Sequence, residues 1–178
     1  MIHAVAELVE NGIDVRLSVG GTDSRHSPGY LDRLRRMCAG GRHVTFLGYV
    51  PESEVPSLFQ NAAIAVLPYA TITGMSGVAI QSAMYGVPIV ASDIPPFRAL
   101  EREGLRMTFF EWLNKESLKD AIRQLLRSPQ AREEDTLRNL EYCQRQRMEI
   151  VARKYVDLVE DLVAAGRPGR RVLTATGL

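Results

Sequence analysis

Short apolar runs alternate with amphipathic helical segments along most of this chain, and this alternation constrains the fold more than any other feature. Residues 63–68 are almost wholly apolar, which is typical of a parallel strand buried on both faces. Because the connections are only a few residues long, the pattern predicts an α/β fold of three layers, a parallel sheet with helices on both faces. The expected strands are residues 13–19, 44–48, 63–68, 88–92 and 106–110, and the expected helices are residues 1–11, 30–39, 52–61, 77–85, 117–126 and 133–163, the last with a break near Met148.

Length and charge set the broad class. The chain has 178 residues, 46% of them hydrophobic, which is enough for one domain with a real core. We expect this domain to cover residues 1–165 and residues 166–178 to form a loose basic tail. The formal net charge of +1 creates no overall field toward nucleic acid or membranes. With no apolar run near the roughly 20 residues that span a bilayer and no signal-peptide pattern, we expect a cytoplasmic protein.

The residues that commonly bind metals are few and scattered. The two cysteines, Cys38 and Cys143, lie far apart and have no metal-ligand spacing, and the three histidines are equally dispersed. No Ser–His–Asp set, cysteine nucleophile, Walker loop or paired carboxylates stand out. The sequence therefore predicts no metal site, no cofactor and reduced thiols.

A run of small residues, Thr73 to Gly77, stands directly before the helix predicted over residues 77–85. Such a loop exposes backbone N–H groups, and the helix start adds unpaired N–H groups and the positive end of its dipole. This chemistry suits a phosphate. Open parallel sheets bind ligands beyond the carboxyl ends of their strands, where Gly20-Gly21 and residues 48–51 are also expected. Arg25 follows the Gly20-Gly21 turn and can reach a phosphate there, and Arg98, after Ile94-Pro95-Pro96, is a second arginine of this kind; the alternative for both is a solvated side chain. Asp93 can cap the segment that follows it instead of contacting a ligand.

Two adjoining segments resemble the C-terminal, donor-binding half of group 1 (family 4) glycosyltransferases, a Rossmann-like half of the GT-B fold. They are VTFLGYVPESEVPSLFQNAAIAVLPYA and TGMSGVAIQSAMYGVPIVASDIPPFRAL. The resemblance covers roughly residues 1–163 and rests on the order of the motifs. It implies an enzyme that transfers a sugar from a nucleoside diphosphate sugar, the donor substrate, and that retains the anomeric configuration. The motif positions that match are Leu67-Pro68, Ser82-Ala83-Met84, Gly86, Pro88 and Val90-Ala91-Ser92-Asp93.

The resemblance also implies roles for individual residues. The glycine turn after the first strand falls on Gly20 and Gly21, and the loop beside the base falls on Tyr49 and Val50. The donor diphosphate is expected on the backbone N–H groups of Gly74, Met75, Ser76 and Gly77.

Two family glutamates are replaced in this chain. The glutamate that binds the ribose hydroxyls is Gln81 here, and the one that contacts the sugar is Thr73. A neutral amide offers one acceptor and one donor where a carboxylate accepts two charge-assisted hydrogen bonds. We therefore expect Gln81 to hold a ribose hydroxyl less tightly than glutamate would.

The family's basic pair and its acceptor-binding domain are expected upstream of the first helix, so the resemblance implies half of an enzyme that is inactive alone. Contact with the inner membrane face, if made, would belong to that missing domain. The last helix, residues 148–163, packs on the missing domain in the family, and its exposed apolar face here predicts self-association. Two rival functions remain: a non-catalytic nucleotide-sugar-binding partner or regulatory subunit, and a GT-B sugar-nucleotide epimerase, for which no acid and histidine set is found. The base, sugar and acceptor stay open.

Overall fold

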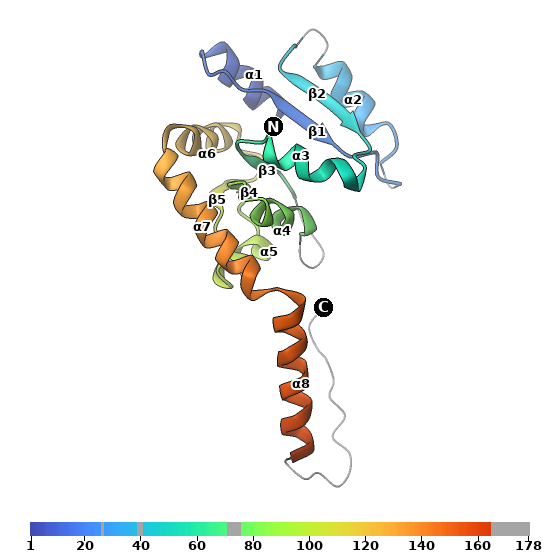
Figure 1. Ribbon diagram of the computed structural model, residues 1–178. Helices are drawn as coiled ribbons and strands as arrows, with labels where there is room; N and C mark the ends of the chain where they lie inside the picture. The colour runs from blue at the N-terminus through green and yellow to red at the C-terminus, as the bar shows by residue number, and fades with distance from the viewer. Residues whose placement is uncertain (26, 39–40, 71–75, 165–178) are drawn as a thin grey trace.

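The strands form two parallel ladders. The computed structural model describes residues 1–25, 27–38, 41–70 and 76–164 (Figure 1). Within them, β1 (Leu17–Gly20) pairs with β2 (Val44–Gly48), while β4 (Ile89–Ser92) lies between β3 (Ala65–Leu67) and β5 (Thr108–Phe110). All three pairings are parallel, as predicted. The expected single sheet is divided, because among the described residues no ladder joins β1 to β3.

The helices follow the predicted order, with one addition. The segment α5 (Pro95–Arg102) was not predicted as a helix because Pro95-Pro96 is typical of a loop. Proline nevertheless fits the first helical turn, where a backbone N–H would have no acceptor within the helix. A short 3₁₀ turn, η1 (Glu52–Glu54), precedes α3 (Val55–Gln60). The predicted break near Met148 is confirmed, since one helix ends at Arg145 and the next begins at Met148. The helices are α1 (Ile2–Glu10), α2 (Tyr30–Met37), α3 (Val55–Gln60), α4 (Gly77–Met84), α5 (Pro95–Arg102), α6 (Lys115–Arg127), α7 (Pro129–Arg145) and α8 (Met148–Ala164).

Two apolar clusters on opposite faces of β4 create the three layers. Ile89 and Ala91 pack with side chains of α4, α5 and α7, whereas Val90 packs with α1 and α6. Successive side chains of a strand point to opposite faces, so β4 feeds both clusters in turn. All four residues of β4 are buried. The predicted α/β class, parallel strands with helices on both sides, is therefore confirmed.

The last helix extends away from both clusters. Figure 1 shows α8 projecting from the body of the protein beyond the end of α7. Met148 is 78% exposed and Tyr155 67% exposed, and neither belongs to an apolar cluster. None of the helices in the described part of the chain is long and apolar enough to cross a membrane. The predicted tail, residues 166–178, lies outside the described residues.

An ion-pair group joins α1 to α6. The side chain of Lys119 is only 7% exposed, and its Nζ lies 2.5 Å from Glu7 Oε2 and 2.7 Å from Glu116 Oε1. The ammonium of Lys115 also donates to Glu7. A nearly buried ammonium is tolerated because carboxylates surround it. Hydrogen bonds from Lys115 and Lys119 lower the pKa of Glu7 to about 2.

The lowered pKa of Glu7 predicts a pH-dependent contribution to folding. A carboxyl whose pKa falls from 4.5 in the unfolded chain to about 2 in the folded one stabilises the fold above pH 4.5, and this contribution is lost as the pH falls to about 2. We expect Glu7→Gln to lower the melting temperature at pH 7 and to have little effect near pH 2. Thermal unfolding at several pH values measures the difference. Glu10→Gln, at an exposed position of the same helix, is the control; equal effects of the two variants would contradict the prediction.

Candidate functional site

The turns that follow β1 and β2 lie together at the carboxyl edge of their ladder. The N–H of Gly21 donates to the carbonyl of Gly48 at 2.7 Å. Gly20 lies against Val50, because a Cβ on Gly20 would stand 3.2 Å from Val50 Cγ2. Gly21 and Gly48 have φ angles of +120° and +69°, which favour glycine at both positions. The structure thus brings the predicted first-strand turn beside the predicted base-adjacent loop.

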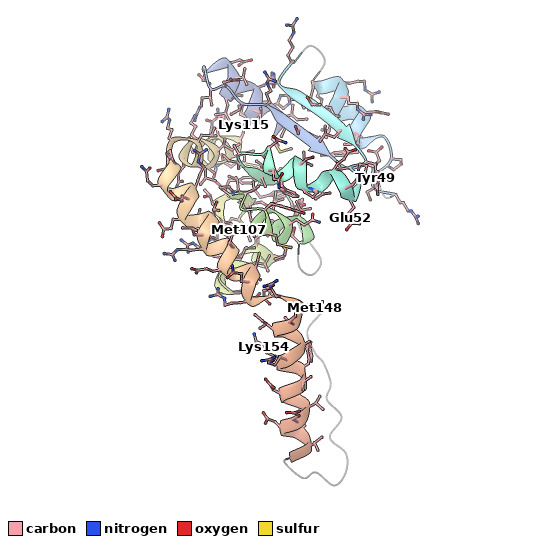
Figure 2. All side chains as sticks on the ribbon, in the orientation of Figure 1. Tyr49, Glu52, Met107, Lys115, Met148 and Lys154 are labelled. Atoms are coloured by element: carbon pink, nitrogen blue, oxygen red, sulfur yellow. The ribbon has the colours of Figure 1, made fainter. Side chains whose placement is uncertain are left out.

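Tyr49 is the most prominent side chain of this edge. It is 75% exposed and lies near Glu52, which opens η1 (Figure 2). Val50 beside it is half-buried and lies against Gly20. An exposed aromatic ring that is fixed at its backbone by a paired glycine turn offers an apolar face to a planar ligand.

The start of α4 presents backbone donors at the second ladder. Ser76 is the N-cap; it is buried, and its Oγ accepts a hydrogen bond from the N–H of Ala79 at 3.3 Å. The intrahelical ladder begins with the N–H of Ile80, which donates to the Ser76 carbonyl. Earlier N–H groups of a helix have no acceptor within it. Gly77 is exposed, and no described atom lies within 4 Å of the position that a Cβ would take there. An anion can therefore approach these donors closely.

Ser92 fixes the segment that enters the predicted phosphate loop. This residue ends β4 and is fully buried. Its hydroxyl donates to the carbonyl of Tyr69 at 2.5 Å and lies 3.3 Å from the carbonyl of Leu67. The Tyr69 ring stacks on Phe97, with 5.7 Å between centroids. Residue 92 was not among the predicted site residues, although a polar side chain at the end of an apolar strand is a signal for such a role.

The remaining predicted contacts on this side are only partly described. Gln81 lies on the second turn of α4, with its side chain exposed. In the described part of the chain no hydrogen-bond partner of its amide is found. Thr73, Gly74 and Met75 lie outside the described residues. On this side of the site the structure therefore describes three predicted residues, Ser76, Gly77 and Gln81.

The two arginines predicted to reach a phosphate, Arg25 and Arg98, have different surroundings. Arg25 is exposed on the loop after Gly21, and no acid among the described residues forms an ion pair with it. The loop is held by Asp23, whose carboxylate accepts from the N–H groups of Gly29 and Leu31 at 2.6 and 2.8 Å. Arg25 is thus a cation on an anchored loop at the carboxyl edge.

Arg98, in contrast, is paired with two acidic side chains, one just before α5 and one within it. Its guanidinium makes two hydrogen bonds of 2.7 Å to Asp93 and one of 2.9 Å to Glu101. It also lies 3.7 Å above the ring of Phe109. The Arg98 guanidinium lowers the pKa of Asp93, which pairs with it instead of capping the following helix, whose N-cap is Ile94. Arg98 is therefore a poor candidate for ligand binding.

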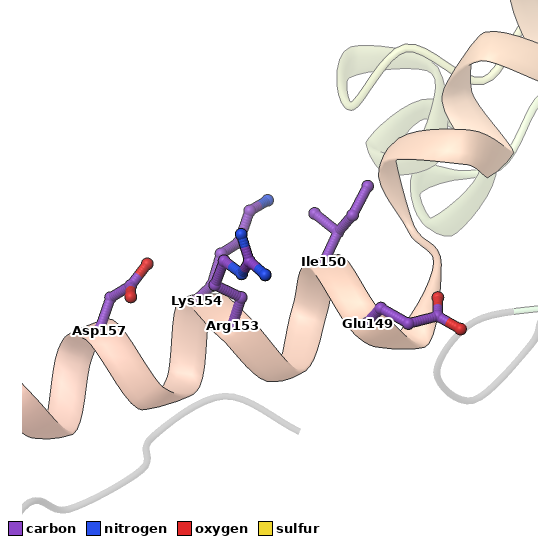
Figure 3. A pocket seen from close by; sticks show the side chains of 5 residues that line it. All are labelled: Glu149, Ile150, Arg153, Lys154 and Asp157. Atoms are coloured by element: carbon purple, nitrogen blue, oxygen red, sulfur yellow. The ribbon is translucent and has the colours of Figure 1, made fainter.

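A separate hollow lies on α8 and not at the sheet edge. Figure 3 shows its lining side chains, all on α8: Glu149, Ile150, Arg153, Lys154 and Asp157. One exposed helix surface with mixed charges has no opposing wall among the described residues, so it encloses no ligand. The described residues also contain no group of three His, Cys, Asp or Glu side chains placed to hold a metal ion.

Comparison with known proteins defines the class and then the family. The structural neighbours are GT-B glycosyltransferases. The sequence profile of the group 1 glycosyl transferases matches residues 1–128, and the chain belongs to this family. The resemblance expected from the sequence is thereby confirmed.

Individual relatives match nearly all of this chain but less than half of their own length. A phosphatidyl-myo-inositol mannosyltransferase of Mycobacterium leprae is 26% identical over 168 residues, which are 93% of this chain and 43% of the relative. The sucrose-phosphate synthase of Thermosynechococcus elongatus has a TM-score of 0.72 at 19% identity, covering 93% of this chain and 43% of the synthase. HepE of Anabaena, solved with UDP and glucose, has a TM-score of 0.73 at 16% identity, covering 89% and 43%.

Proposed function

We propose that this chain is the donor-binding half of a retaining glycosyltransferase that uses a nucleoside diphosphate sugar and an acceptor held by another domain. The proposal rests on the start of α4. There Ser76 caps the helix, and Gly77, which has no side chain, leaves the backbone N–H donors accessible to an anion at the carboxyl edge. A structural neighbour, HepE, was solved with UDP and glucose, which supports a nucleotide-sugar ligand for this fold.

The chemistry required of this half is electrostatic. A departing nucleoside diphosphate gains negative charge, and donors fixed in advance stabilise that charge without reorganising. The N–H groups at the start of α4 and the guanidinium of Arg25 are donors of this kind. We assign the ribose to Gln81 and the base to Tyr49. All of these groups therefore serve to bind the donor substrate, and we assign no role to a metal or a cofactor.

A non-catalytic partner is the second candidate function. Gln81 stands where the family resemblance implies a glutamate, and an amide forms weaker hydrogen bonds to hydroxyls than a carboxylate. A regulatory subunit needs to bind the nucleotide sugar but does not need the tightest ribose contact. The two functions differ in one measurable property: the donor-binding half of an enzyme should transfer sugar once an acceptor domain is supplied, whereas a non-catalytic partner should not.

Nucleotide titration tests the binding proposal. By isothermal titration calorimetry with UDP, GDP and ADP, we expect one of the three to bind with a dissociation constant of roughly 1 mM, equivalent to about 4 kcal/mol. Arg25→Ala should weaken the binding further, because it removes a cation that no acid among the described residues pairs with. Arg102→Ala, at an exposed position on the last turn of α5, is the matched control and should change nothing. Absence of heat with all three nucleotides at millimolar concentration would count against a donor domain.

A further inference from the structure

The turn that follows β5 exposes the only tryptophan of the chain at the carboxyl edge of the sheet. Trp112 is 46% exposed and its neighbour Leu113 is 80% exposed, although the two phenylalanines of β5 pack inside the protein. We propose that Trp112 is a stacking platform for the ring of a sugar, and that the carboxylate of Glu111 accepts hydrogen bonds from the sugar's hydroxyl groups. The proposal does not depend on nucleotide binding, because its ligand is a glycoside without a nucleotide.

Four hydrogen bonds hold this turn in place. The N–H of Asn114 donates to the carbonyl of Glu111 at 3.0 Å, which closes the turn around Trp112 and Leu113. The side-chain nitrogen of Asn114 donates to Glu111 Oε2 at 2.8 Å, and its side-chain oxygen accepts from the N–H of Ser117 at 3.0 Å. The N–H of Glu111 donates to Ser117 Oγ at 2.9 Å. The backbone of Trp112 is therefore fixed between β5 and α6, and a fixed platform reduces the entropy lost when a ligand binds.

Leu113 has a backbone conformation that leucine rarely adopts. Its φ of +63° is the only positive φ of a residue other than glycine in the described part of the chain. The third position of a turn with a positive φ normally carries glycine, because a Cβ is disfavoured there. The Leu113 side chain is exposed, so its own burial does not offset this cost. Strained backbone of this kind is concentrated at functional sites, which directs attention to the exposed ring of Trp112 beside it.

The chemistry of the turn fits a sugar ring. The C–H groups on one side of a pyranose form an apolar face, and the negatively charged face of an indole attracts their hydrogens. Sugar hydroxyls donate hydrogen bonds to carboxylates. Glu111 is exposed, and its Oε1 has no hydrogen-bond donor among the described residues. The two neighbouring residues thus offer an aromatic face and a hydrogen-bond acceptor, the two kinds of contact that a pyranose makes.

Two other kinds of ligand fit this turn less well. An anionic membrane is disfavoured because exposed carboxylates follow the ends of β4 and β5, on Asp93 and Glu111, while the ammonium of Lys115 is paired with Glu7. A standard protein interface covers about 800 Å² on each partner. Here polar residues, Glu111 and Asn114, flank the exposed apolar pair on both sides. A small neutral ligand with hydroxyl groups therefore fits best.

The parallel sheet places this turn on the same edge as the start of α4. Since β3, β4 and β5 run parallel, their carboxyl ends lie at one edge. The N–H of Asp93, directly after β4, donates to the carbonyl of Phe110 at 2.8 Å, and Trp112 follows two residues later. Neighbouring strands are about 4.8 Å apart, so the ends of β3 and β5 are separated by roughly 10 Å. A sugar on Trp112 would therefore share this edge with the candidate phosphate site without occupying it.

Intrinsic fluorescence tests the proposal directly, because Trp112 is the only tryptophan of the chain. The probes are the methyl glycosides of glucose, mannose and galactose, added to the 178-residue chain. With at least one of them we expect a saturable change in emission, with a dissociation constant of roughly 10 mM. The acrylamide quenching constant should fall by about half, because a stacked ring covers one face of the indole. Glycerol, which has hydroxyl groups but no ring, is the control ligand and should give no saturable change.

Saturation-transfer NMR extends the test to variants of the turn. Trp112→Ala should weaken glycoside binding by about tenfold or more, because it removes the platform. Trp112→Phe, which keeps an aromatic face, should retain part of the affinity. The matched control is Leu113→Ala, an equally exposed apolar position of the same turn, which should bind within about twofold of the original chain. Circular dichroism verifies that all three variants are folded.

The possible results separate a sugar platform from other roles of the turn. Saturable binding of a glycoside that is lost in folded Trp112→Ala and kept in Leu113→Ala supports the proposal. Absence of a saturable change with all three glycosides overturns it, as does equal binding by the original chain and Trp112→Ala. A blue shift of the emission with vesicles of phosphatidylcholine and phosphatidylglycerol would assign the turn to a membrane, and a blue shift that increases with protein concentration would assign it to a second copy. Either shift, without glycoside binding, also overturns the proposal.

Discussion

The purified 178-residue chain should transfer no sugar from any nucleotide sugar, and addition of an acceptor domain should restore transfer. Transfer requires an acceptor hydroxyl held against the anomeric carbon, and such positioning is worth about 7–11 kcal/mol of the barrier. In the described residues, the candidate site has donors on one side only, at the carboxyl edge of the two ladders. The curated mannosyltransferase it resembles is more than twice as long, since this chain covers 43% of it.

The same prediction includes the association state of the chain. Met148, Val151, Tyr155, Leu158 and Leu162 recur on α8 at alternating spacings of three and four residues, which is the spacing of a coiled-coil seam. Because α8 contributes to neither apolar cluster, we propose that this face associates with a second copy when no other domain covers it. Tyr155→Glu together with Leu158→Lys should shift the chain to monomer at micromolar concentration, as measured by sedimentation.

Three measurements separate the outcomes of this prediction. Sugar transfer from a nucleotide sugar by the isolated monomer would contradict the proposal that this chain is only the donor-binding half of the enzyme. Nucleotide binding without transfer, even after fusion to the acceptor domain of a relative, would favour the non-catalytic partner. The control for fusion is the same protein with Gln81→Ala, which should retain its fold because residue 81 is exposed and should lose transfer because the ribose contact is removed.

Local sequence patterns predicted the elements well where one physical signal dominated. The uninterrupted apolar run around β3 and the glycine that ends β2 both indicate strands without reference to the rest of the chain. The break between α7 and α8 was also predicted near Met148. The helix α5 was missed because a Pro-Pro pair indicates a loop when its place in the first helical turn is unknown.

Contacts between distant segments were not predictable from these patterns. Asn139 is fully buried on α7, where its amide oxygen accepts from the N–H of Arg106 at 2.7 Å and its amide nitrogen donates to the Arg106 carbonyl at 3.1 Å. Ser92 similarly bonds the carbonyl of Tyr69. Each partner is a backbone group more than 20 positions away, and a backbone group has no sequence signature. The division of the sheet was missed for the same reason, since strand pairing is a long-range property.

The predicted ligand residues depend on both kinds of information. The resemblance placed Gly20, Gly21, Tyr49 and Val50 at one edge, and the structure brings them together through the Gly21–Gly48 hydrogen bond. The sequence predicted Arg98 as a cation that could bind a phosphate, whereas in the structure its guanidinium is paired with Asp93. The binding roles themselves remain predictions that nucleotide titration must test.

Ser76→Asp should abolish nucleotide binding while the protein keeps its fold. Aspartate is as good an N-cap as serine, and a carboxylate at a helix N-terminus is favourable, so α4 should still begin at Gly77. In the bound state the new carboxylate would stand beside the diphosphate. Like charges about 4 Å apart near a protein surface repel by roughly 4 kcal/mol, which is about a thousandfold in affinity.

The matched control for this substitution is Ser76→Asn. Asparagine has nearly the size and the capping ability of aspartate but no charge, so the difference between the two variants isolates electrostatic repulsion from steric effects. We expect nucleotide to bind the asparagine variant within a few-fold of the original chain and not to bind the aspartate variant at millimolar concentration. Circular dichroism and melting temperature verify that both are folded. Equal nucleotide affinity of the two folded variants would place the diphosphate away from the start of α4, because a carboxylate at the N-cap would repel any anion bound at that helix start.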